Sequence, residues 1–232
     1  MEDRIMNSIS DSLPIPRSSP LYGEVKTIGI WMSGGIDSSL LAWKLADQIE
    51  DHDLCIKLQP FTVRRSRPYN PFHAEAVLEK IYKGNHVLDM ITYYPDKNDP
   101  HQCDTQEFID RDMENFTNGV IQIMYSGISQ NPPLEEIKAT EGWYTHKNGT
   151  IQHTETNRDK PGKLEEYGYE PHHGHYINPW SRFNKKDIAS EYERLGLWDI
   201  FEATRSCEGD DGMGPCGICW WCFEKKWAFG RL

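Results

Sequence analysis

The chain has 232 residues, of which 38% are hydrophobic, and a formal net charge of −11. This length suits one α/β domain with a small appendage, and the acidic charge argues against non-specific binding to nucleic acid, which needs a basic surface. No apolar run reaches the length of a membrane span and the polar N-terminus has no apolar signal region, so we expect a cytoplasmic protein without a membrane partner.

Residues 1–24 are polar and contain three prolines, which predicts an N-terminal extension that is partly ordered at best. From residue 25 the chain alternates between short apolar runs and segments with apolar residues at helical spacing. The first pair is a strand from Thr27 to Met32 and a helix from Ser38 to Glu50. Further strands are predicted at 54–61, 86–93 and 120–125, and further helices at 72–83, 104–115 and 184–195. This alternation predicts an α/β fold, a doubly wound parallel sheet that binds its ligand at the carboxyl ends of the strands.

The turn between the first strand and the first helix reads Ser-Gly-Gly-Ile-Asp-Ser-Ser. Its glycines allow close approach of a phosphate, its serine hydroxyls add donors, and the N–H groups at a helix N-terminus favour anions. Asp37 is suited to hold a Mg²⁺ ion that bridges phosphates. The alternative is an ordinary strand-to-helix turn capped by Ser or Asp. The candidate ATP-binding residues are Ser33, Gly34, Gly35, Asp37, Ser38 and Ser39.

This turn is neither a Walker A loop, because no lysine follows it, nor a G-x-G-x-x-G turn. The pattern S-G-G-x-D-S resembles the PP-loop of ATP pyrophosphatases, which split ATP between the α- and β-phosphates. The resemblance implies a nucleotide-binding domain of the PP-loop (HUP-like) type, which we place at residues 25–206.

Strand and helix periodicity fails between residues 129 and 175, where the chain is polar and rich in charged residues. A stretch of this length within a compact domain is usually functional or mobile. We therefore expect a long polar lid or insertion at about 129–175.

Four of the six cysteines lie in the last 26 residues, at the spacing C-x8-C-x2-C-x2-C. Two-residue gaps allow backbone turns to bring thiolates to one tetrahedral centre, and four thiolates close the shell of a structural Zn²⁺ ion. The alternatives are an iron–sulfur cluster, four free cysteines or a redox pair. The candidate metal ligands, in a zinc-binding segment at 207–232, are Cys207, Cys216, Cys219 and Cys222.

With the PP-loop at one end and this cluster at the other, the chain resembles the 7-cyano-7-deazaguanine synthases. That family ends in S-C, a short loop, C-G-x-C-x-x-C, a basic stretch and A-F. Here the matching residues begin at Ser206-Cys207, continue at Cys216-Gly217-Ile218-Cys219 and end at Ala228-Phe229. Pro179 is followed six residues later by Lys185-Lys186-Asp187-Ile188, which is similar to the family's K-x-[DE]-I. His73-Ala74-Glu75 looks like the polar segment that follows the second strand in the family.

The resemblance implies an ATP-dependent ligase of queuosine biosynthesis. It converts 7-carboxy-7-deazaguanine and ammonia to 7-cyano-7-deazaguanine (preQ0), through an adenylated intermediate, with Mg²⁺ and Zn²⁺ as cofactors. It also implies catalytic roles for Asp37 and Lys185, although Lys185 could equally be a solvated lysine at a helix start. We expect Gly127 to let substrate or adenosine approach and Asn131 to hydrogen-bond the base. The family tends to form homodimers, so a homodimer is implied here.

Three alternatives stay open. The Y-P-D-C-R string that helps the family bind substrate is missing after Gly127, which suits a variant that stops at the amide. A PP-loop tRNA sulfurtransferase would want a sulfur-carrying cysteine near ATP and a basic RNA surface. A non-enzymatic zinc module would have no use for an intact S-G-G-I-D-S loop.

Overall fold

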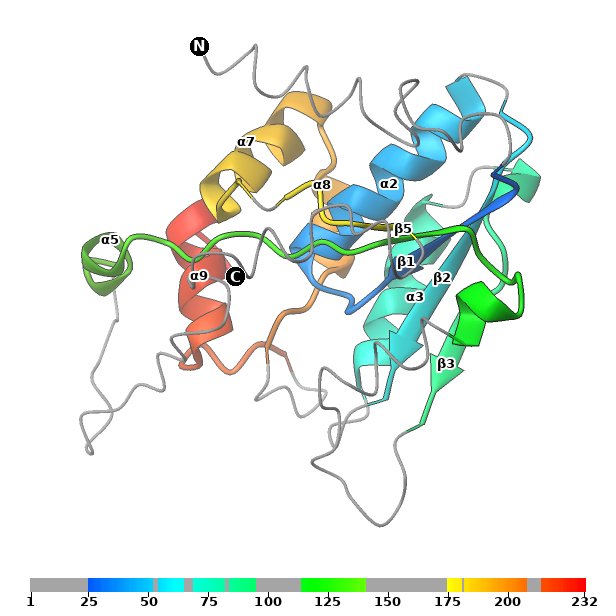
Figure 1. Cartoon of the computed structure of the whole chain (residues 1–232). Helices are drawn as coiled ribbons and strands as arrows, with labels where there is room; N and C mark the ends of the chain where they lie inside the picture. Colours follow the sequence, from blue (N-terminus) through cyan, green and yellow to red (C-terminus); the bar gives the residue numbers. More distant parts are fainter. Residues whose placement is uncertain are drawn as a thin grey trace.

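The computed structural model describes residues 25–51, 54–64, 69–81, 84–94, 114–140, 175–180, 182–207 and 214–232 (Figure 1). Within these ranges, no helix combines the length and the apolar character that crossing a membrane requires.

A five-stranded parallel sheet, in the order β3-β2-β1-β4-β5, forms the centre of the fold. Successive strands run outward from β1 to β3, and the chain then returns to the other side of β1 to add β4 and β5. The crossovers therefore diverge between β1 and β4, and such a switch point is where open α/β sheets bind ligands. The strands are β1 (Thr27–Trp31), β2 (Lys57–Val63), β3 (Ile91–Tyr93), β4 (Ile123–Tyr125) and β5 (His175–Ile177).

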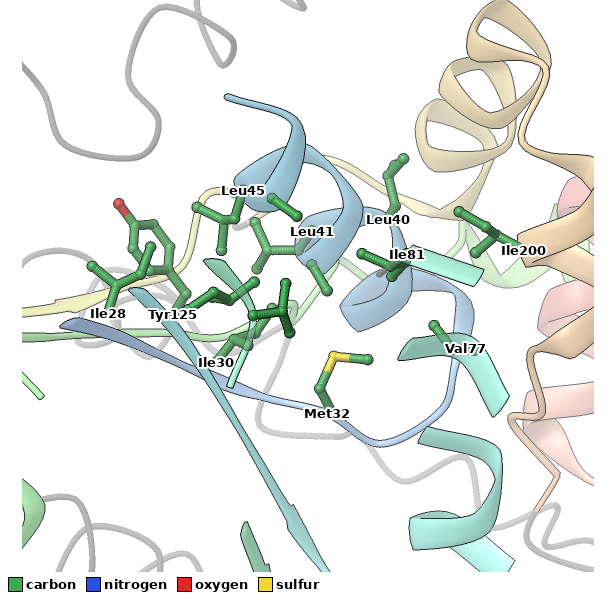
Figure 2. Close-up of a cluster of buried hydrophobic side chains, with 14 of the residues drawn as sticks. Ile28, Ile30, Met32, Leu40, Leu41, Leu45, Val77, Ile81, Tyr125 and Ile200 are labelled. Atoms are coloured by element: carbon green, nitrogen blue, oxygen red, sulfur yellow. The ribbon is translucent and has the colours of Figure 1, made fainter. Parts of the chain in front are cut away.

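The helices pack around this sheet (Figure 1). One continuous hydrophobic core joins β1 to α2, α3, α7 and α8. Figure 2 shows its centre, where Ile28 and Ile30 of β1 lie beneath Leu41 and Leu45 of α2. The helical elements are α2 (Ile36–Asp51), α3 (Tyr69–Ile81), the short 3-10 turn η1 (Gly84–His86), α5 (Leu134–Lys138), α7 (Lys185–Leu195), α8 (Trp198–Ala203) and α9 (Trp220–Phe229).

The predicted α/β fold with a parallel sheet is confirmed, and so are the strand and helix on either side of the glycine turn. The predicted helix at 184–195 is α7, which begins with a capping box between Asn184 and Asp187. The helix predicted at 104–115 lies outside the described residues except for its end.

Three predicted strands have clearly different limits in the structure, and the strand expected at 120–125 begins only at Ile123. The strand expected at 54–61 starts later, since the Leu54 N–H donates to Ile49 O and closes the end of α2. The strand expected at 86–93 is split into a bridge at Val87 and the strand β3. The Met32 N–H donates to Phe61 O, so the backbone N–H and C=O of Phe61 point toward β1. The backbone of the neighbouring Pro60 therefore points to the other side, toward β3. Proline has no N–H to donate on that side, which interrupts the ladder there.

Four short strands or α-helices were not predicted from the sequence. Helix α5 lies inside the stretch expected to be a lid or insertion, strand β5 begins at the last residue of that stretch, and α8 and α9 follow the last predicted helix. A three-residue strand such as β5 is too short to show periodicity, and it exists because it pairs with β4. Residues 141–174 of the expected lid lie outside the described residues.

Candidate functional site

The glycine turn lies at the carboxyl end of β1, beside the switch point. Gly34 has φ of 74°, a left-handed conformation that favours glycine. A Cβ at Gly34 would lie 2.7 Å from the Cβ of His73 and 3.0 Å from the backbone nitrogen of Ala74. The glycine therefore allows the turn to pack directly on the start of α3.

The three serines of the turn mostly bond within it. The Ser38 and Ser39 hydroxyls both donate to Gly35 O, at 3.2 and 2.7 Å, and both side chains are buried. The Gly35 N–H donates to the Ser33 hydroxyl at 3.2 Å, and Ser33 is exposed. Ser38 and Ser39 thus shape the loop, while Ser33 is the serine that faces solvent. The N–H groups of the first turn of α2 have no partner within the helix, as at any helix start.

Asp37 is the charged residue of this turn, and its two carboxylate oxygens differ. Oδ2 accepts from the Ser129 hydroxyl at 2.9 Å and from Lys185 Nζ at 2.6 Å. Oδ1 is buried and has no hydrogen-bond partner among the described residues. A buried carboxylate oxygen without a donor is costly, and a cation at that point removes the cost. The chemistry of Oδ1 therefore fits a hard divalent cation such as Mg²⁺.

Lys185 lies in the site and is not a solvated helix-start lysine. Its side chain is 4% exposed, and Nζ also lies 3.3 Å from Oε2 of Glu224, a fully buried carboxylate on α9. At that distance the second contact is an ion pair and not a well-formed hydrogen bond. The structure thus brings together two predicted residues, Asp37 and Lys185, with two that the sequence did not single out, Ser129 and Glu224.

A weak signal for both of the missed residues is present in the sequence. Ser129 follows Gly127 by two positions in the segment after β4, and Glu224 is a carboxylate within the aromatic run Trp-Trp-Cys-Phe-Glu. Neither pattern identifies the residue that the side chain contacts, because the contacting residues belong to elements far away in the chain.

Gly127 packs on the N-terminus of α2. A Cβ at Gly127 would lie 2.9 Å from Ser38 N and 3.0 Å from the Asp37 carbonyl carbon, so only glycine fits without a backbone shift. The predicted substrate residue Asn131 is partly buried in the same segment, four residues farther along. A role in substrate binding stays a prediction for both residues.

The segment after β4 is held in place by Asn178, a buried residue that follows β5. Its side chain accepts from the Ile128 N–H at 3.2 Å and donates to Ile128 O at 3.0 Å. The Gln130 N–H donates to Phe183 O at 2.7 Å. These bonds fix the backbone on both sides of Ser129 and so aim its hydroxyl at Asp37.

Two aromatic side chains hold the start of α2. The Trp180 indole N–H donates to Asp37 O at 3.1 Å, and the Tyr192 hydroxyl donates to Ile36 O at 2.9 Å. Burial, and then the nearby charge of Asp37, raise the pKa of Tyr192 well above its ordinary value, so it remains a neutral donor. The glycine turn is therefore supported from β4, β5 and α7 as well as by its own bonds.

The four C-terminal cysteines form one compact group. Their sulfur atoms all lie within 4.8 Å of one another, with Cys216 to Cys222 at 4.0 Å and Cys207 to Cys219 at 3.9 Å. Tetrahedral Zn–S bonds of about 2.3 Å place sulfurs about 3.8 Å apart, so the group fits a single ion. A [4Fe–4S] cluster holds its cysteine sulfurs farther apart, since four iron atoms lie between them.

The pKa values of two of the cysteine thiols show that protons compete with an ion at this site. Burial raises the pKa of the Cys207 thiol to about 11, and a hydrogen bond with Cys219, together with burial, raises that of Cys222. A bound cation reverses this preference because it stabilises thiolates, and its binding releases protons. The Cys216 N–H donates to Cys207 Sγ at 3.2 Å, a contact that also supports a thiolate.

Two connections join the cysteine cluster to the glycine turn. The segment that ends in Cys207 passes beside the turn, where the Arg205 N–H donates to Gly34 O at 2.8 Å. Helix α9 begins directly after Cys219, its N-cap residue, and carries Glu224 to Lys185. The predicted metal site and the predicted nucleotide site are therefore neighbours in the fold.

The sequence matches no protein-family model, and the comparison with curated proteins finds no match. Three solved structures are similar to this chain. The U34-tRNA thiolase NcsA of Methanococcus maripaludis, with its [4Fe-4S] cluster, has a TM-score of 0.49 and 12% identity, over 98% of this chain and 71% of that one. The NMN synthetase of Francisella tularensis has a TM-score of 0.45 and 14% identity, over 100% and 85%. The NAD⁺ synthetase of Burkholderia pseudomallei has a TM-score of 0.42 and 8% identity, over 100% and 81%. All three scores lie below 0.5, so these structures add no weight to any particular activity.

Proposed function

We propose that the chain is an ATP-dependent ligase of the PP-loop type that forms a carbon–nitrogen bond. The observation that carries the proposal is the largely buried carboxylate of Asp37 at the start of α2 in the S-G-G-I-D-S turn, whose Oδ1 has no hydrogen-bond partner in the part of the chain that the structure describes. The specific substrates, 7-carboxy-7-deazaguanine and ammonia, rest on the resemblance to 7-cyano-7-deazaguanine synthases. The residues that support them are the C-G-x-C-x-x-C segment and Lys185 after Pro179.

The chemistry overcomes the poor reactivity of a carboxylate toward nucleophiles. A substrate carboxylate oxygen attacks the α-phosphorus of ATP, pyrophosphate leaves, and an acyl adenylate forms. Ammonia adds to the acyl carbon, a proton is lost, and AMP leaves to give the amide. A second ATP activates the amide oxygen in the same way, and loss of AMP and protons gives the nitrile.

The protein's part in these steps is positioning and charge stabilisation. The N–H groups of the first turn of α2 hold the leaving pyrophosphate, with the exposed Ser33 hydroxyl as a further donor. Lys185 offsets negative charge as pyrophosphate departs. Mg²⁺, held at Asp37, supplies charge neutralisation at the phosphates. Gly127 and Asn131, in the segment after β4, are proposed to contact the substrate.

The cysteine cluster is proposed to hold a structural Zn²⁺ ion. Four thiolates leave no open position for a substrate, so the ion has no direct part in the reaction. Its proposed role is to fix the start of α9 and the segment that ends in Cys207.

The test is an assay of products. The purified protein is incubated with ATP, Mg²⁺, ammonium and 7-carboxy-7-deazaguanine, the base is analysed by mass spectrometry, and AMP is quantified. We expect the nitrile and AMP from the wild type and about 10²–10³-fold slower formation of both by Asp37→Asn, with Asp51→Asn at the exposed end of the same helix as the control. An amide that accumulates supports the variant that stops early. An unchanged base without AMP contradicts the proposed substrate.

A further inference from the structure

Lys185 lies between two carboxylates that the solvent barely reaches. The exposed fraction is 13% for the Asp37 side chain, 4% for Lys185 and 0% for Glu224. One ammonium therefore faces two carboxylates in a part of the fold from which water is largely excluded. The three charges depend on one another there, because ion pairs in a buried place are screened little.

The position of Lys185 on its helix is also unfavourable by itself. It is the first residue of α7, where the helix dipole disfavours a positive charge and favours an acid such as Asp187. A lysine at this point therefore adds nothing to the stability of the helix end. Its placement is explained by the two carboxylates that it reaches, and one of these belongs to the proposed nucleotide site.

The single negative charge of Asp37 cannot pair equally strongly with Lys185 and with a bound cation. Lys185 and Ser129 already share Oδ2, while Oδ1 has no partner among the residues that the structure describes. A divalent cation at Oδ1 draws the carboxylate charge away from the ammonium, since the two cations compete for it. Lys185 then needs a second anchor, and Glu224 Oε2 at 3.3 Å provides one.

We propose that Glu224 is a positioning residue of the nucleotide site, which holds the Lys185 ammonium in place while Asp37 binds the Mg²⁺ of Mg²⁺·ATP. The proposal rests on the proposed use of ATP at this site, but not on the identity of the second substrate. Glu224 lies two residues beyond Cys222, in the second turn of α9. The cysteine cluster thus fixes the part of the helix from which Glu224 acts.

The test uses Glu224→Gln, which keeps the shape of the side chain and removes its charge. Binding of a non-hydrolysable ATP analogue to the full-length protein is measured by calorimetry at rising Mg²⁺ concentration, and Tm is measured in parallel. We expect the Mg²⁺ concentration at half-saturation to rise about tenfold, within the usual range of coupling between sites. In this variant Asp37 is the remaining carboxylate beside Lys185, so Lys185 competes harder with the cation. The Tm should change little, because Lys185 keeps its ion pair with Asp37 and Gln keeps the shape of the side chain.

Two further variants complete the test. Glu224→Asp keeps the charge on a shorter side chain and should show a smaller rise, about threefold, even if Glu224→Gln fails to fold. Glu193→Gln, at an exposed position of α7, should bind as the wild type does. A lower Tm with wild-type Mg²⁺ dependence in both Glu224 variants would mean that the residue is only structural, and overturns this proposal alone. A wild type that binds no nucleotide at any Mg²⁺ concentration overturns the proposed function as well.

Discussion

The glycine turn and the cysteine cluster are both short motifs, but they depend on different things for their shape. The turn is closed by its own serines and held by Trp180 and Tyr192, so the polypeptide alone accounts for its geometry. The cluster brings four sulfurs within 4.8 Å, where burial and mutual hydrogen bonds disfavour thiolates. The comparison teaches that hydrogen bonds from the polypeptide can shape a loop before its ligand arrives, with Asp37 Oδ1 left without a donor among the described residues. Four crowded sulfurs are instead expected to depend on a bound ion for a fixed arrangement.

Removal of the metal is expected to have the largest effect on stability. A ligand at about 1,000 times its Kd stabilises a protein by about 4 kcal/mol. For a chain of this size that corresponds to a fall in Tm of about 10 °C. We therefore expect chelator-treated protein and Cys219→Ser to melt about 10 °C lower, as measured by calorimetry alongside the zinc content. Cys55→Ser, an exposed cysteine outside the cluster, is the control. An unchanged Tm in zinc-free protein would show that the cysteine cluster needs no ion for its stability.

The second-largest effect is expected from a substitution at Asp37, and it should be a loss of activity rather than of stability. Asp37→Asn keeps the shape of the side chain but removes the charge proposed to hold Mg²⁺, so AMP formation should fall by about 10²–10³-fold, as when one electrostatic contact of an active site is lost. The Tm should move by only a few degrees, about 2–4 °C per kcal/mol. Quench-flow or steady-state measurement of AMP checks the first part and calorimetry the second. A large fall in Tm without loss of activity would mean that Asp37 contributes to stability and not to the reaction, which contradicts the proposed role of the glycine turn.

Substitution of Gly127 tests whether the glycine turn depends on its contact with the segment after β4. In Gly127→Ala the new Cβ meets backbone atoms of Asp37 and Ser38, which cannot move aside as a side chain could. We expect a destabilisation of about 1–3 kcal/mol, typical of overpacking, and weaker binding of the ATP analogue. Gly119→Asn is the control, because nothing lies within 4 Å of a Cβ there and Asn tolerates its positive φ of 68°. Wild-type affinity in Gly127→Ala would show that the turn is held by its own bonds alone.

The smallest effect is expected from the ion pair that ties α2 to α7. Lys44 of α2 pairs with Glu191 of α7. Burial alone would raise the pKa of Glu191, but hydrogen bonds from Arg194 and Lys44 outweigh it, and the pKa lies below its ordinary value of 4.5. The pairing therefore stabilises the folded state above pH 4.5, and this contribution is lost as the pH falls through the lower folded-state pKa.

The variant Glu191→Gln should accordingly be less stable than the wild type near neutral pH, with a difference that shrinks as the pH falls below 4.5. Urea unfolding of both proteins across that range measures the difference, with Glu193→Gln of the same helix as the exposed control. A difference that does not depend on pH would point to lost packing rather than lost charge.

The sequence by itself determined the features that depend on neighbours along the chain. Apolar spacing predicts β1, α2 and α7, the order of strands and helices predicts the parallel sheet, and residue spacing predicts both the glycine turn and the cysteine group. These predictions succeed because periodicity, capping and short loops act over a few residues.

Only the tertiary structure decided which charges meet. Asp37 and Lys185 are 148 positions apart, Ser129 reaches Asp37 across 92, and Glu224 arrives from the C-terminal helix. Strand β5 likewise exists only through its pairing with β4, which no local pattern encodes. Such contacts follow from the order of the strands and the packing of the helices, because burial and charge pairing depend on distance in space and not on distance along the chain.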